Sequence, residues 1–360
     1  MKAAICRQFR APLEIETVAI GKPDAGEVKI SIDAVAICHS DVSFIHGYWG
    51  GALPAIYGHE AAGTVIEIGS PSSEFGKGDR VIVTLMRSCG GCSVCSGGAE
   101  ALCAIPPASG EGATARTEDG EAVWSAMHTG AFAEQVIVHE RQIVRLPDDM
   151  PSDIGALIGC GVITGYGAVR HVAKICKGET VAIVGCGGVG VNAIQAARIA
   201  GASIITAIDT SPSKQAISRQ LGATDFVRLA EDADYEKARA VTDDTGYDAV
   251  LVAVGSASVI SSALRLLKPG GRLVVMGLPP SGDMSEIEMT NLASYGQTII
   301  GTKMGMAQIR QDIPEIISLY REGKWVLDEL ISGRFDFNQI NDAIAAAQQA
   351  ENVRIIVTMR

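Results

Sequence analysis

The stretch Thr180-Val-Ala-Ile-Val-Gly-Cys-Gly-Gly-Val-Gly190 decides the fold of this chain. Residues 181–184 are a short apolar run typical of a buried strand, and residues 191–200 have the composition and periodicity of a helix. The G-x-G-x-x-G between them allows a tight turn, a close approach of backbone to a pyrophosphate, and close packing of helix on strand. A pyrophosphate would then lie at a helix N-terminus, where free N–H groups favour an anion. The stretch predicts a dinucleotide-binding unit.

A second β run, residues 202–208, ends at Asp209. This carboxylate can accept both hydroxyls of an adenosine ribose and would repel a 2′-phosphate, and no arginine follows it in residues 210–214. NAD is therefore favoured over NADP. Lys214 either touches the ribose or is a solvated surface lysine. The cofactor contacts predicted in this half of the chain are Gly185, Gly187, Gly188, Val189, Gly190, Asp209, Lys214, Val254 and Leu278.

Strand-like and helical segments alternate after this stretch, whereas β-rich segments with glycine and proline between them precede it. The alternation predicts an α/β fold with a doubly wound parallel sheet, and the earlier segments indicate a separate, mostly antiparallel domain. The expected strands are 27–36, 63–69, 80–85, 248–254, 271–277, 298–301 and 355–358, and the expected helices are 215–221, 259–267 and 309–321. No internal repeat is visible.

Length, charge and composition exclude several classes of protein. A chain of 360 residues is expected to form two domains, and 47% hydrophobic residues with 41 glycines suit a well-packed α/β protein. The net charge of −11 argues against a nucleic-acid partner. The N-terminus reads as a strand and not as a signal peptide, no apolar run reaches the length of a membrane span, and nine cysteines are an odd number. We expect a soluble, cytoplasmic protein without a membrane partner.

Four cysteines form a compact pattern, C-x2-C-x2-C-x7-C, in a glycine-rich loop. Four thiolates suit a tetrahedral Zn²⁺ and leave it no open coordination position, so such a site is structural. Two disulfides are the alternative. The four residues are Cys89, Cys92, Cys95 and Cys103.

A third set of residues is dispersed: Cys38 in Cys-His-Ser-Asp, His59 in Gly-His-Glu, and Cys160 in Gly-Cys-Gly. One histidine and two cysteines are three protein ligands for a catalytic zinc whose fourth position stays open. A buried cysteine or a hydrogen-bonded core histidine is the alternative for each of them.

These motifs together resemble the zinc-dependent medium-chain alcohol dehydrogenases. Cys-His-Ser-Asp (38–41), Gly-His-Glu-Ala-Ala-Gly (58–63), the four cysteines, Gly-Cys-Gly-Val-Ile-Thr-Gly-Tyr-Gly (159–167) and the glycine-rich loop occur in the order and spacing of that family. The resemblance implies a GroES-like catalytic domain from residues 1–161 and 304–360, with a structural zinc lobe at about 88–104, and a Rossmann domain from 162–303.

The resemblance also implies roles for single residues and two zinc ions per chain. The implied catalytic zinc ligands are Cys38, His59 and Cys160, with Glu60 close enough to approach the metal. Asp41 would orient His59, Thr164 would lie against the nicotinamide, and Arg354 and His39 would contact cofactor phosphates. Zinc would lower the pKa of a bound alcohol, and a hydride would pass from the alcohol to NAD.

The alcohol proton must leave the site, and Ser40 is the hydroxyl that the resemblance places to accept it. Many relatives have a histidine three residues later, where this chain has Ser43. Proton exit through Ser40, the nicotinamide ribose and water is therefore the first hypothesis, with His46 as a substitute acceptor. The expected substrate pocket is lined by Ser40, Trp49, Leu85, Met127 and Leu278.

The expected substrates are primary or secondary alcohols, with aromatic alcohols among them, and the corresponding aldehydes or ketones. Glutathione-dependent formaldehyde dehydrogenases use an arginine after the fourth cysteine, and no basic residue occurs here between Cys103 and Arg116, which disfavours that activity. A polyol or threonine dehydrogenase of the same superfamily, or a non-catalytic cofactor-binding relative, are the alternatives. We expect a homodimer or homotetramer.

Overall fold

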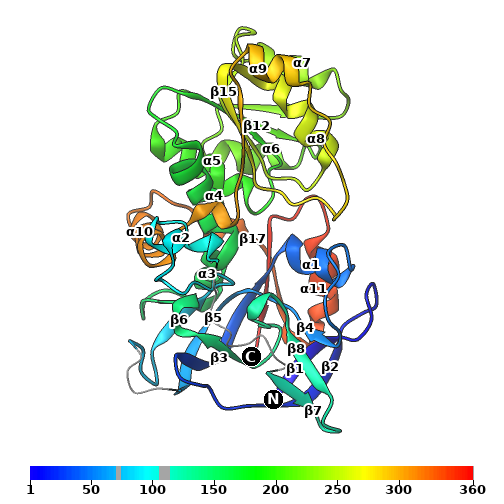
Figure 1. The fold of residues 1–360 in the computed structure, drawn as a ribbon, viewed down its shortest axis with the longest axis vertical. Coiled ribbons are helices and arrows are strands. Elements are labelled where there is room, and N and C mark those ends of the chain that lie inside the picture. The colour runs from blue at the N-terminus through cyan, green and yellow to red at the C-terminus, as the bar shows by residue number, and fades with distance from the viewer. Residues whose placement is uncertain (70–73, 105–113, 360) are drawn as a thin grey trace. The chain divides into compact units, whose positions relative to one another are not determined.

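The computed structural model describes residues 1–69, 74–104 and 114–359 (Figure 1). It contains two compact units, and the chain passes between them more than once. The first unit comprises Met1–Cys160, Gln308–Ile313 and Leu327–Arg360, and the second comprises Gly161–Ala307 and Pro314–Val326. Residues 161, 304–307 and 314–326, which were predicted to belong to the catalytic domain, group with the second unit.

The first unit is built from a small closed barrel and a seven-stranded sheet. The barrel strands are β1 (Lys2–Cys6), β2 (Glu14–Ile20), β7 (Ala115–Thr117), β8 (Ala122–Ser125) and β4 (Ala55–Ile56). The sheet runs β10 (Ile143–Arg145), β6 (Arg80–Val83), β5 (Glu60–Ile68), β3 (Glu27–Ile37), β18 (Arg354–Thr358) and β17 (Ile331–Asp336), and β9 (Gln135–His139) also pairs with β3. The antiparallel pairing of β3 with β5, β9 and β18 agrees with the predicted mostly antiparallel domain.

Short helices cover this unit and connect its strands. They are α1 (His39–Ile45), α2 (Ser93–Ser96), α3 (Ser152–Leu157) and α11 (Ile340–Ala347), with 3₁₀ turns at Glu100–Leu102, Ala126–His128, Glu140–Gln142, Asp328–Leu330 and Phe337–Gln339. The unit has a core of aliphatic side chains from both the barrel and the sheet, in which Ile5, Ile30 and Ile56 are almost fully buried. Strand β18 closes the sheet between β3 and β17, so the C-terminal residues return to this unit.

The second unit is a six-stranded parallel sheet with the order β13, β12, β11, β14, β15, β16. Its strands are β11 (Thr180–Val184), β12 (Ile204–Asp209), β13 (Asp225–Arg228), β14 (Tyr247–Val252), β15 (Leu267–Val275) and β16 (Thr298–Gly301). Residues 181–184 are all buried, so both faces of β11 are covered, as the continuous apolar run predicts. The doubly wound α/β fold is confirmed.

The helices of this unit are α4 (Ile163–Gly167), α5 (Gly190–Ala200), α6 (Lys214–Leu221), α7 (Asp234–Ala240), α8 (Ala257–Ala263), α9 (Met289–Ser294) and most of α10 (Ile309–Arg321), with 3₁₀ turns at Leu264–Leu266 and Met304–Met306. In Figure 1, α5 and α8 lie on opposite sides of the strands. Residues of α7 and α8, such as Ala238 and Ile260, pack with Val184 and Val252 in one apolar core.

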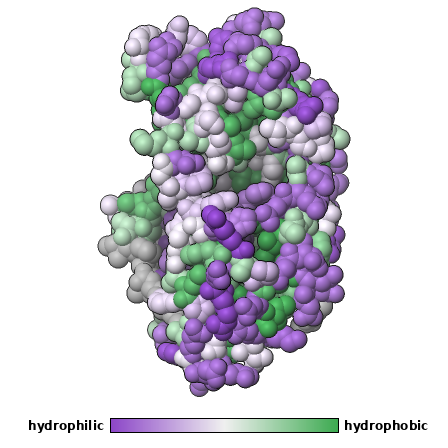
Figure 2. Space-filling model, turned by 90° about the vertical axis from the view of Figure 1, so that its right-hand side faces the viewer, coloured by the Kyte–Doolittle hydropathy of each residue, from purple (hydrophilic) through white to green (hydrophobic). Residues whose placement is uncertain are grey.

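The prediction that no segment is long and apolar enough to cross a membrane is wrong for one helical stretch of 22 residues, Ser152–Ala173. However, 89% of its most apolar window is buried inside the protein, so it is a core helix here. Two π-helical segments, Ile158–Val162 and Ala168–Ala173, interrupt it. On the face drawn in Figure 2, hydrophilic residues predominate and hydrophobic ones form small patches between them.

Candidate active site

Cys38 and Asp41 are placed by the start of helix α1. Cys38 is the N-cap residue, with an extended backbone, and its N–H donates to Asp41 Oδ2 at 3.0 Å. This is a capping box, in which the third helical residue reaches back to the cap. Asp41 is fully buried and Cys38 is 6% exposed. The Cys-His-Ser-Asp spacing therefore fixes the thiol and the carboxylate side by side.

His59 lies immediately before strand β5, and Asp41 holds its ring. His59 Nδ1 is 2.9 Å from Asp41 Oδ1, which also accepts the N–H of Gly58 at 3.0 Å. Since the carboxylate only accepts, Nδ1 carries the hydrogen and Nε2 is left as the ligand atom. Nε2 is buried and has no hydrogen-bond partner among the described residues. A buried imidazole lone pair of this kind is suited to bind a metal ion.

Cys160 approaches this pair from a π-helical turn, Ile158–Val162. The preceding residue, Gly159, allows the approach, because a Cβ there would lie 2.7 Å from the carbonyl oxygen of Val83 and 3.1 Å from the Cα of Glu60. The helix can thus press against β5 and β6. As a result, one ligand atom each from Cys38, His59, Glu60 and Cys160 lies within 4.8 Å of the others, and all four residues are buried. This donor set fits zinc.

The electrostatics of the cluster favour a cation. A hydrogen bond from Cys160 holds the pKa of the Cys38 thiol well below its usual value, despite burial. Burial lowers the pKa of His59, but the charge of Asp41 and the hydrogen bond to it outweigh this and hold the pKa well above its ordinary value. The same negative charges that favour a proton on Nε2 favour a metal ion there.

Arg354 and Glu60 form a buried ion pair beside the cluster. The guanidinium of Arg354 donates to Glu60 Oε2, and the two side chains are 5% and 0% exposed. Burial raises the pKa of Glu60 to about 7, and the charge of Arg354 opposes that rise. No local sequence pattern reveals this pairing, because 294 residues separate the partners. The cofactor-phosphate role of Arg354 stays a prediction.

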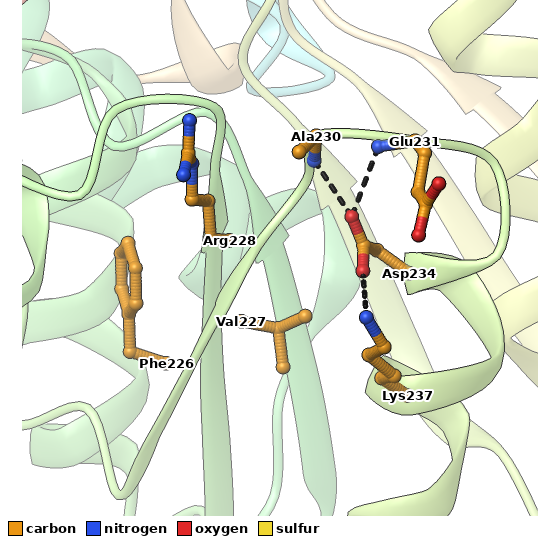
Figure 3. A pocket seen from close by; sticks show the side chains of 7 residues that line it. All are labelled: Phe226, Val227, Arg228, Ala230, Glu231, Asp234 and Lys237. Carbon is orange, nitrogen blue, oxygen red and sulfur yellow. Dashed lines mark hydrogen bonds and ion pairs between the residues drawn. The ribbon is translucent and has the colours of Figure 1, made fainter.

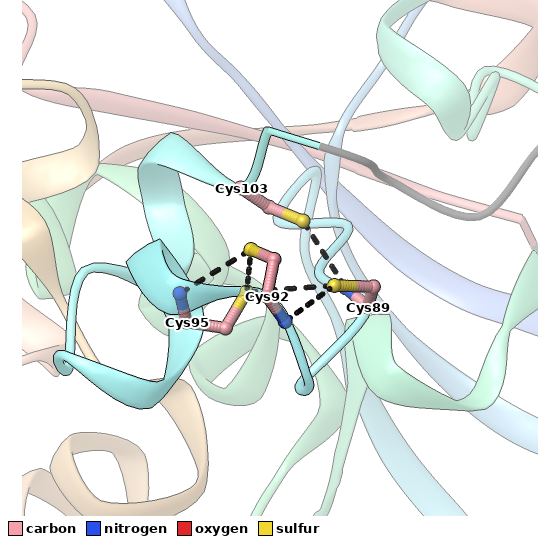
Figure 4. Close-up of side chains that lie close together, drawn as sticks. All are labelled: Cys89, Cys92, Cys95 and Cys103. Atoms are coloured by element: carbon pink, nitrogen blue, oxygen red, sulfur yellow. Dashed lines mark hydrogen bonds between the residues drawn. The ribbon is translucent and has the colours of Figure 1, made fainter.

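The four remaining predicted metal ligands also come together, around helix α2 (Figure 4). Their Sγ atoms lie 3.5 Å apart for Cys92 and Cys95 and 4.0 Å apart for Cys89 and Cys95. A tetrahedral zinc with Zn–S bonds of about 2.3 Å places its sulfurs about 3.8 Å apart. A disulfide requires about 2.05 Å, and all four cysteines, Cys103 included, are free thiols. The geometry therefore fits a closed zinc site and does not fit two disulfides.

Backbone N–H groups donate to three of these sulfurs. Cys92 Sγ accepts the N–H of Cys95, Cys89 Sγ accepts the N–H of Cys92 at 3.3 Å, and Cys103 Sγ accepts the N–H of Cys89 at 3.2 Å. The bond from Cys95 is the main reason why the pKa of Cys92 falls to about 6. Donors aimed at sulfur stabilise thiolates, which are the metal-binding form.

In the second unit, the glycine-rich loop has the conformation that its pattern requires. Gly185 has φ +92°, and a Cβ on Gly190 would lie 1.7 Å from the carbonyl oxygen of Gly185. Asp209 Oδ2 accepts the N–H of Cys186 at 2.7 Å, and Oδ1 accepts that of Ser211 at 2.9 Å. Each carboxylate oxygen retains a second lone pair, so the side chain can still accept ribose hydroxyls. Asp209 thus ties the loop to the end of β12.

Two residues near this loop are deeply buried. The surface alternative for Lys214 is wrong, since the residue is only 4% exposed at the start of α6. Cys186 lies within the loop but is fully buried, and burial raises its pKa to about 12. An inert thiol is therefore expected at this position.

The predicted substrate-pocket and cofactor residues lie in both units. In the first, Ser40 and Leu85 are partly buried, His39 is exposed, and the ring of Trp49 meets that of Phe44 edge-on with centroids 4.9 Å apart. Met127 has a left-handed backbone, φ 52°, in the turn after β8. In the second, Thr164 Oγ1 is 3.8 Å from Met304 Sδ, Val254 is partly buried and Leu278 is 61% exposed.

A surface hollow of about 490 Å³ lies elsewhere, between β13 and α7 (Figure 3). Asp234 at its wall accepts the N–H groups of Ala230 and Glu231 and pairs with Lys237. This carboxylate therefore holds the turn that precedes its own helix. No residue predicted for a functional site lines the hollow.

A GroES-like unit joined to a doubly wound nucleotide-type sheet, with one open and one closed sulfur-rich cluster, defines a zinc-binding dehydrogenase. Comparisons with known protein families agree with this assignment. Residues 24–148 match the family model described as alcohol dehydrogenase GroES-like domain, and residues 188–322 match that of zinc-binding dehydrogenase. The chain belongs to the zinc-dependent medium-chain alcohol dehydrogenase family. It is an oxidoreductase, and the family implies zinc and NAD(P) as cofactors.

Individual relatives match over the whole chain. A probable S-(hydroxymethyl)glutathione dehydrogenase of Schizosaccharomyces pombe is 32% identical to this chain. The matched region covers 99% of this chain and 97% of that protein. An alcohol dehydrogenase zinc-binding domain protein from Burkholderia ambifaria has a TM-score of 0.94 at 31% identity, covering 100% of this chain and 98% of that one. Benzyl alcohol dehydrogenase from Acinetobacter calcoaceticus has a TM-score of 0.92 at 28% identity, and the match covers 100% of this chain and 99% of that one.

Proposed function

We propose that this enzyme reversibly transfers a hydride from a primary or secondary alcohol, aromatic alcohols included, to NAD. The observation that carries the proposal is the buried set of Cys38, His59 and Cys160, in which His59 Nε2 has no hydrogen-bond partner among the described residues. Two thiols and one imidazole are the ligand set of a zinc with an open position. Such a zinc, when bound, supplies a Lewis acid that lowers the pKa of an alcohol.

The chain's own residues orient and protect this centre. Asp41 holds the tautomer and direction of His59 through a 2.9 Å contact. Glu60, adjacent to the ligand His59, is neutralised by Arg354 and so does not add an uncompensated charge to a buried site. Cys89, Cys92, Cys95 and Cys103 are proposed to hold a second, structural zinc, which makes two per chain.

The proposed cofactor is NAD, bound with its pyrophosphate at the glycine-rich loop and its adenosine ribose at Asp209. The carboxylate would repel the 2′-phosphate of NADP. Asp209→Gly tests this, with Asp225→Gly at the start of β13 as a matched control. We expect the ratio of kcat/KM for NAD to that for NADP to fall in the first variant alone. An unchanged ratio in Asp209→Gly contradicts the ribose contact.

Proton release is proposed to begin at Ser40 in the first turn of α1. Its hydroxyl can accept the alcohol proton and pass it to the nicotinamide ribose and water. Ser43 stands where many relatives have a histidine, so the relay is shorter here. His46 lies at the end of the same helix, with its ring 5.5 Å from that of Tyr48. Ser40→Ala should lower kcat, whereas His46→Gln should leave it within about twofold.

An aromatic substrate is supported by the side chains of the first unit. Trp49 meets Phe44 edge-on, Phe44 stacks on Tyr57 at 6.0 Å, and Leu85 occupies a position where relatives often have an aromatic residue. Aromatic rings attract one another in edge-to-face and offset-stacked contacts, so a benzylic ring could join this group. The similarity to benzyl alcohol dehydrogenase points the same way. The segment 105–113, which disfavours a glutathione adduct by its lack of basic residues, lies outside the described residues.

The first experiment measures the increase in absorbance of reduced nicotinamide when purified enzyme is mixed with NAD and each alcohol of a panel. The panel contains primary, secondary and benzylic alcohols, polyols, threonine and S-(hydroxymethyl)glutathione. Benzylic turnover that disappears after metal chelation and returns with zinc supports the proposal. Turnover of polyols, threonine or the glutathione adduct alone would contradict the proposed substrate class and identify another one. Turnover that survives complete removal of zinc would refute the proposed mechanism.

A homo-oligomer is proposed as the working form. Strand β16 ends the parallel sheet and is partly exposed, so its outer edge can pair with a second copy of itself. Apolar side chains nearby in the sequence are exposed, namely Met284 at 86%, Met289 at 64% and Tyr295 at 51%. Light scattering on a size-exclusion column should give twice or four times the mass of 37.5 kDa. A monomer that stays monomeric on concentration contradicts this.

A further inference from the structure

Two buried side chains of the second unit, Asn192 and Trp325, hold a carbonyl group of the glycine-rich loop. Asn192 lies in the first turn of α5 and is fully buried. Its Nδ2 donates to the carbonyl oxygen of Gly188 at 2.7 Å. On its other side, Asn192 Oδ1 accepts Trp325 Nε1–H at 3.2 Å and Gln195 Nε2–H at 3.2 Å. The amide therefore connects the loop to a distant segment of the chain.

Trp325 fixes which way round the Asn192 amide sits. The oxygen and nitrogen of an amide have similar size, and a half-turn exchanges them. An indole N–H can only donate, so it requires Oδ1 on its own side and leaves Nδ2 facing Gly188. Trp325 is itself held firmly: it is 1% exposed, and its ring meets that of Tyr166 at 5.7 Å.

The held carbonyl determines the direction of a neighbouring amide. In a planar trans peptide, the C=O of Gly188 and the N–H of Val189 point in opposite directions. With the carbonyl turned toward Asn192, the Val189 N–H points away from the helix. In the described part of the chain, the N–H groups of Gly188 and Val189 have no hydrogen-bond acceptor. They remain available for an anion at the helix start.

Other contacts join α5 to the segment around Trp325 without touching the glycine-rich loop. Gln195 pairs with the backbone of Val326, accepting its N–H at 2.8 Å and donating to its carbonyl at 2.9 Å. One turn further on, the Arg198 guanidinium donates to the carbonyl of Lys324. These tethers hold α5 in place, and only Asn192 continues to the loop carbonyl. The chain therefore offers a matched control.

We propose that Asn192 and Trp325 are positioning residues for the cofactor, because they keep the Gly188–Val189 peptide turned with its N–H toward the pyrophosphate. This inference rests on the proposed function, in which the loop receives NAD. Neither side chain needs to touch the cofactor. If the Asn192 amide is lost, the Gly188–Val189 peptide can rotate. The carbonyl oxygen of Gly188 can then face the pyrophosphate, and the two negative groups repel each other.

The test uses the full-length, zinc-loaded enzyme with Asn192→Leu, Trp325→Phe and the control Arg198→Met. Isothermal calorimetry gives the Kd for NADH, and steady-state kinetics give KM for each substrate and kcat. For Asn192→Leu we expect Kd for NADH and KM for NAD to rise roughly 3- to 10-fold, the equivalent of one hydrogen bond. At saturating NAD, kcat and the KM for the alcohol should stay unchanged. Trp325→Phe should give a smaller rise, because Gln195 still donates to Asn192.

Arg198→Met should lower the thermal midpoint and leave the Kd for NADH within about twofold of wild type. An unchanged Kd in a folded Asn192→Leu overturns the inference, as does an equal rise in Arg198→Met, which would assign the effect to the tether. If Asn192→Leu does not fold, Trp325→Phe decides, and an unchanged Kd there is also a refutation. A wild-type enzyme that binds no NADH would instead refute the proposed function itself.

Discussion

Replacing Asp41 with asparagine asks whether one buried carboxylate keeps two metal-binding side chains in position. Asp41 is fully buried and accepts three hydrogen bonds, from Cys38 N, Gly58 N and His59 Nδ1. Asparagine has the same shape but only one oxygen. With that oxygen toward His59 and Gly58, its NH₂ group faces the N–H of Cys38, and two donors oppose each other.

The size of the effect follows from these contacts. A buried N–H left without an acceptor costs about 1–3 kcal/mol of folding free energy. Mutation of the group that orients a ligating histidine typically weakens metal binding by roughly 10- to 100-fold, or about 1.4–2.7 kcal/mol. We therefore expect Asp41→Asn to fold with reduced stability and to release its catalytic zinc at a 10- to 100-fold lower chelator activity. The zinc of the four-cysteine site should be retained.

The assay is zinc content by emission spectroscopy after dialysis against a graded series of chelator, with thermal unfolding measured in parallel. Asp234→Asn is the matched control, since Asp234 is 4% exposed and also accepts two backbone N–H groups, but lies in the second unit. It should lose stability and keep both zinc ions. Wild-type chelator resistance in Asp41→Asn would refute the reasoning, and so would an equal loss of zinc in the control.

Three further predictions concern other parts of the chain. Cys103→Ser should lower the zinc content from about two to about one per chain and reduce the thermal midpoint, while the Kd for NADH stays unchanged; a chain that keeps two zinc ions would count against the closed site. Iodoacetamide at pH 8 should label the exposed Cys176 and spare Cys186, as peptide mass spectrometry would show, and rapid labelling of Cys186 would contradict its burial. The hydrogen-bonded ion pair with a lysine one turn later holds the pKa of Asp234 at about 2, below its ordinary value of 3.8. The stabilising contribution of Asp234 is therefore complete above about pH 5 and is lost as the pH falls through about 2. The stability gap between wild type and Asp234→Asn should close over that window in acid-unfolding curves, and a constant gap would exclude the assignment.

The sequence predicts the elements around its motifs well, because the local pattern and the local structure have the same cause. The predicted helix 309–321 and strand 298–301 coincide with α10 and β16, and the glycine-rich loop has the required turn. The four cysteines within residues 89–103 come together as their spacing indicates, because backbone turns set the distances within one short loop. Cys38, His59 and Cys160 also come together, but they lie far apart in the sequence, and only the family resemblance predicted that they would meet.

Contacts between distant segments leave no such pattern. The pairing of Glu60 with Arg354 and the contact of Asn192 with Trp325 depend on how whole strands and helices pack. The π-helical turn at Cys160 was also missed, because helix periodicity does not reveal one extra residue in a turn. Burial of Lys214 is a tertiary effect that overrides its usual preference for water. Packing, which a single sequence expresses only weakly, accounts for each of these cases.

The position of strand β18 has a consequence for biosynthesis. This strand is the last regular element of the chain, yet it lies between β3 and β17, and it carries the arginine that neutralises Glu60, 294 residues upstream. During synthesis, the part of β3 that pairs with β18 therefore stays unpaired until residues 354–358 have left the ribosome. A nonsense codon that removes only residues 354–360 would leave every proposed zinc ligand in the chain and still deprive the nascent metal centre of its counter-charge.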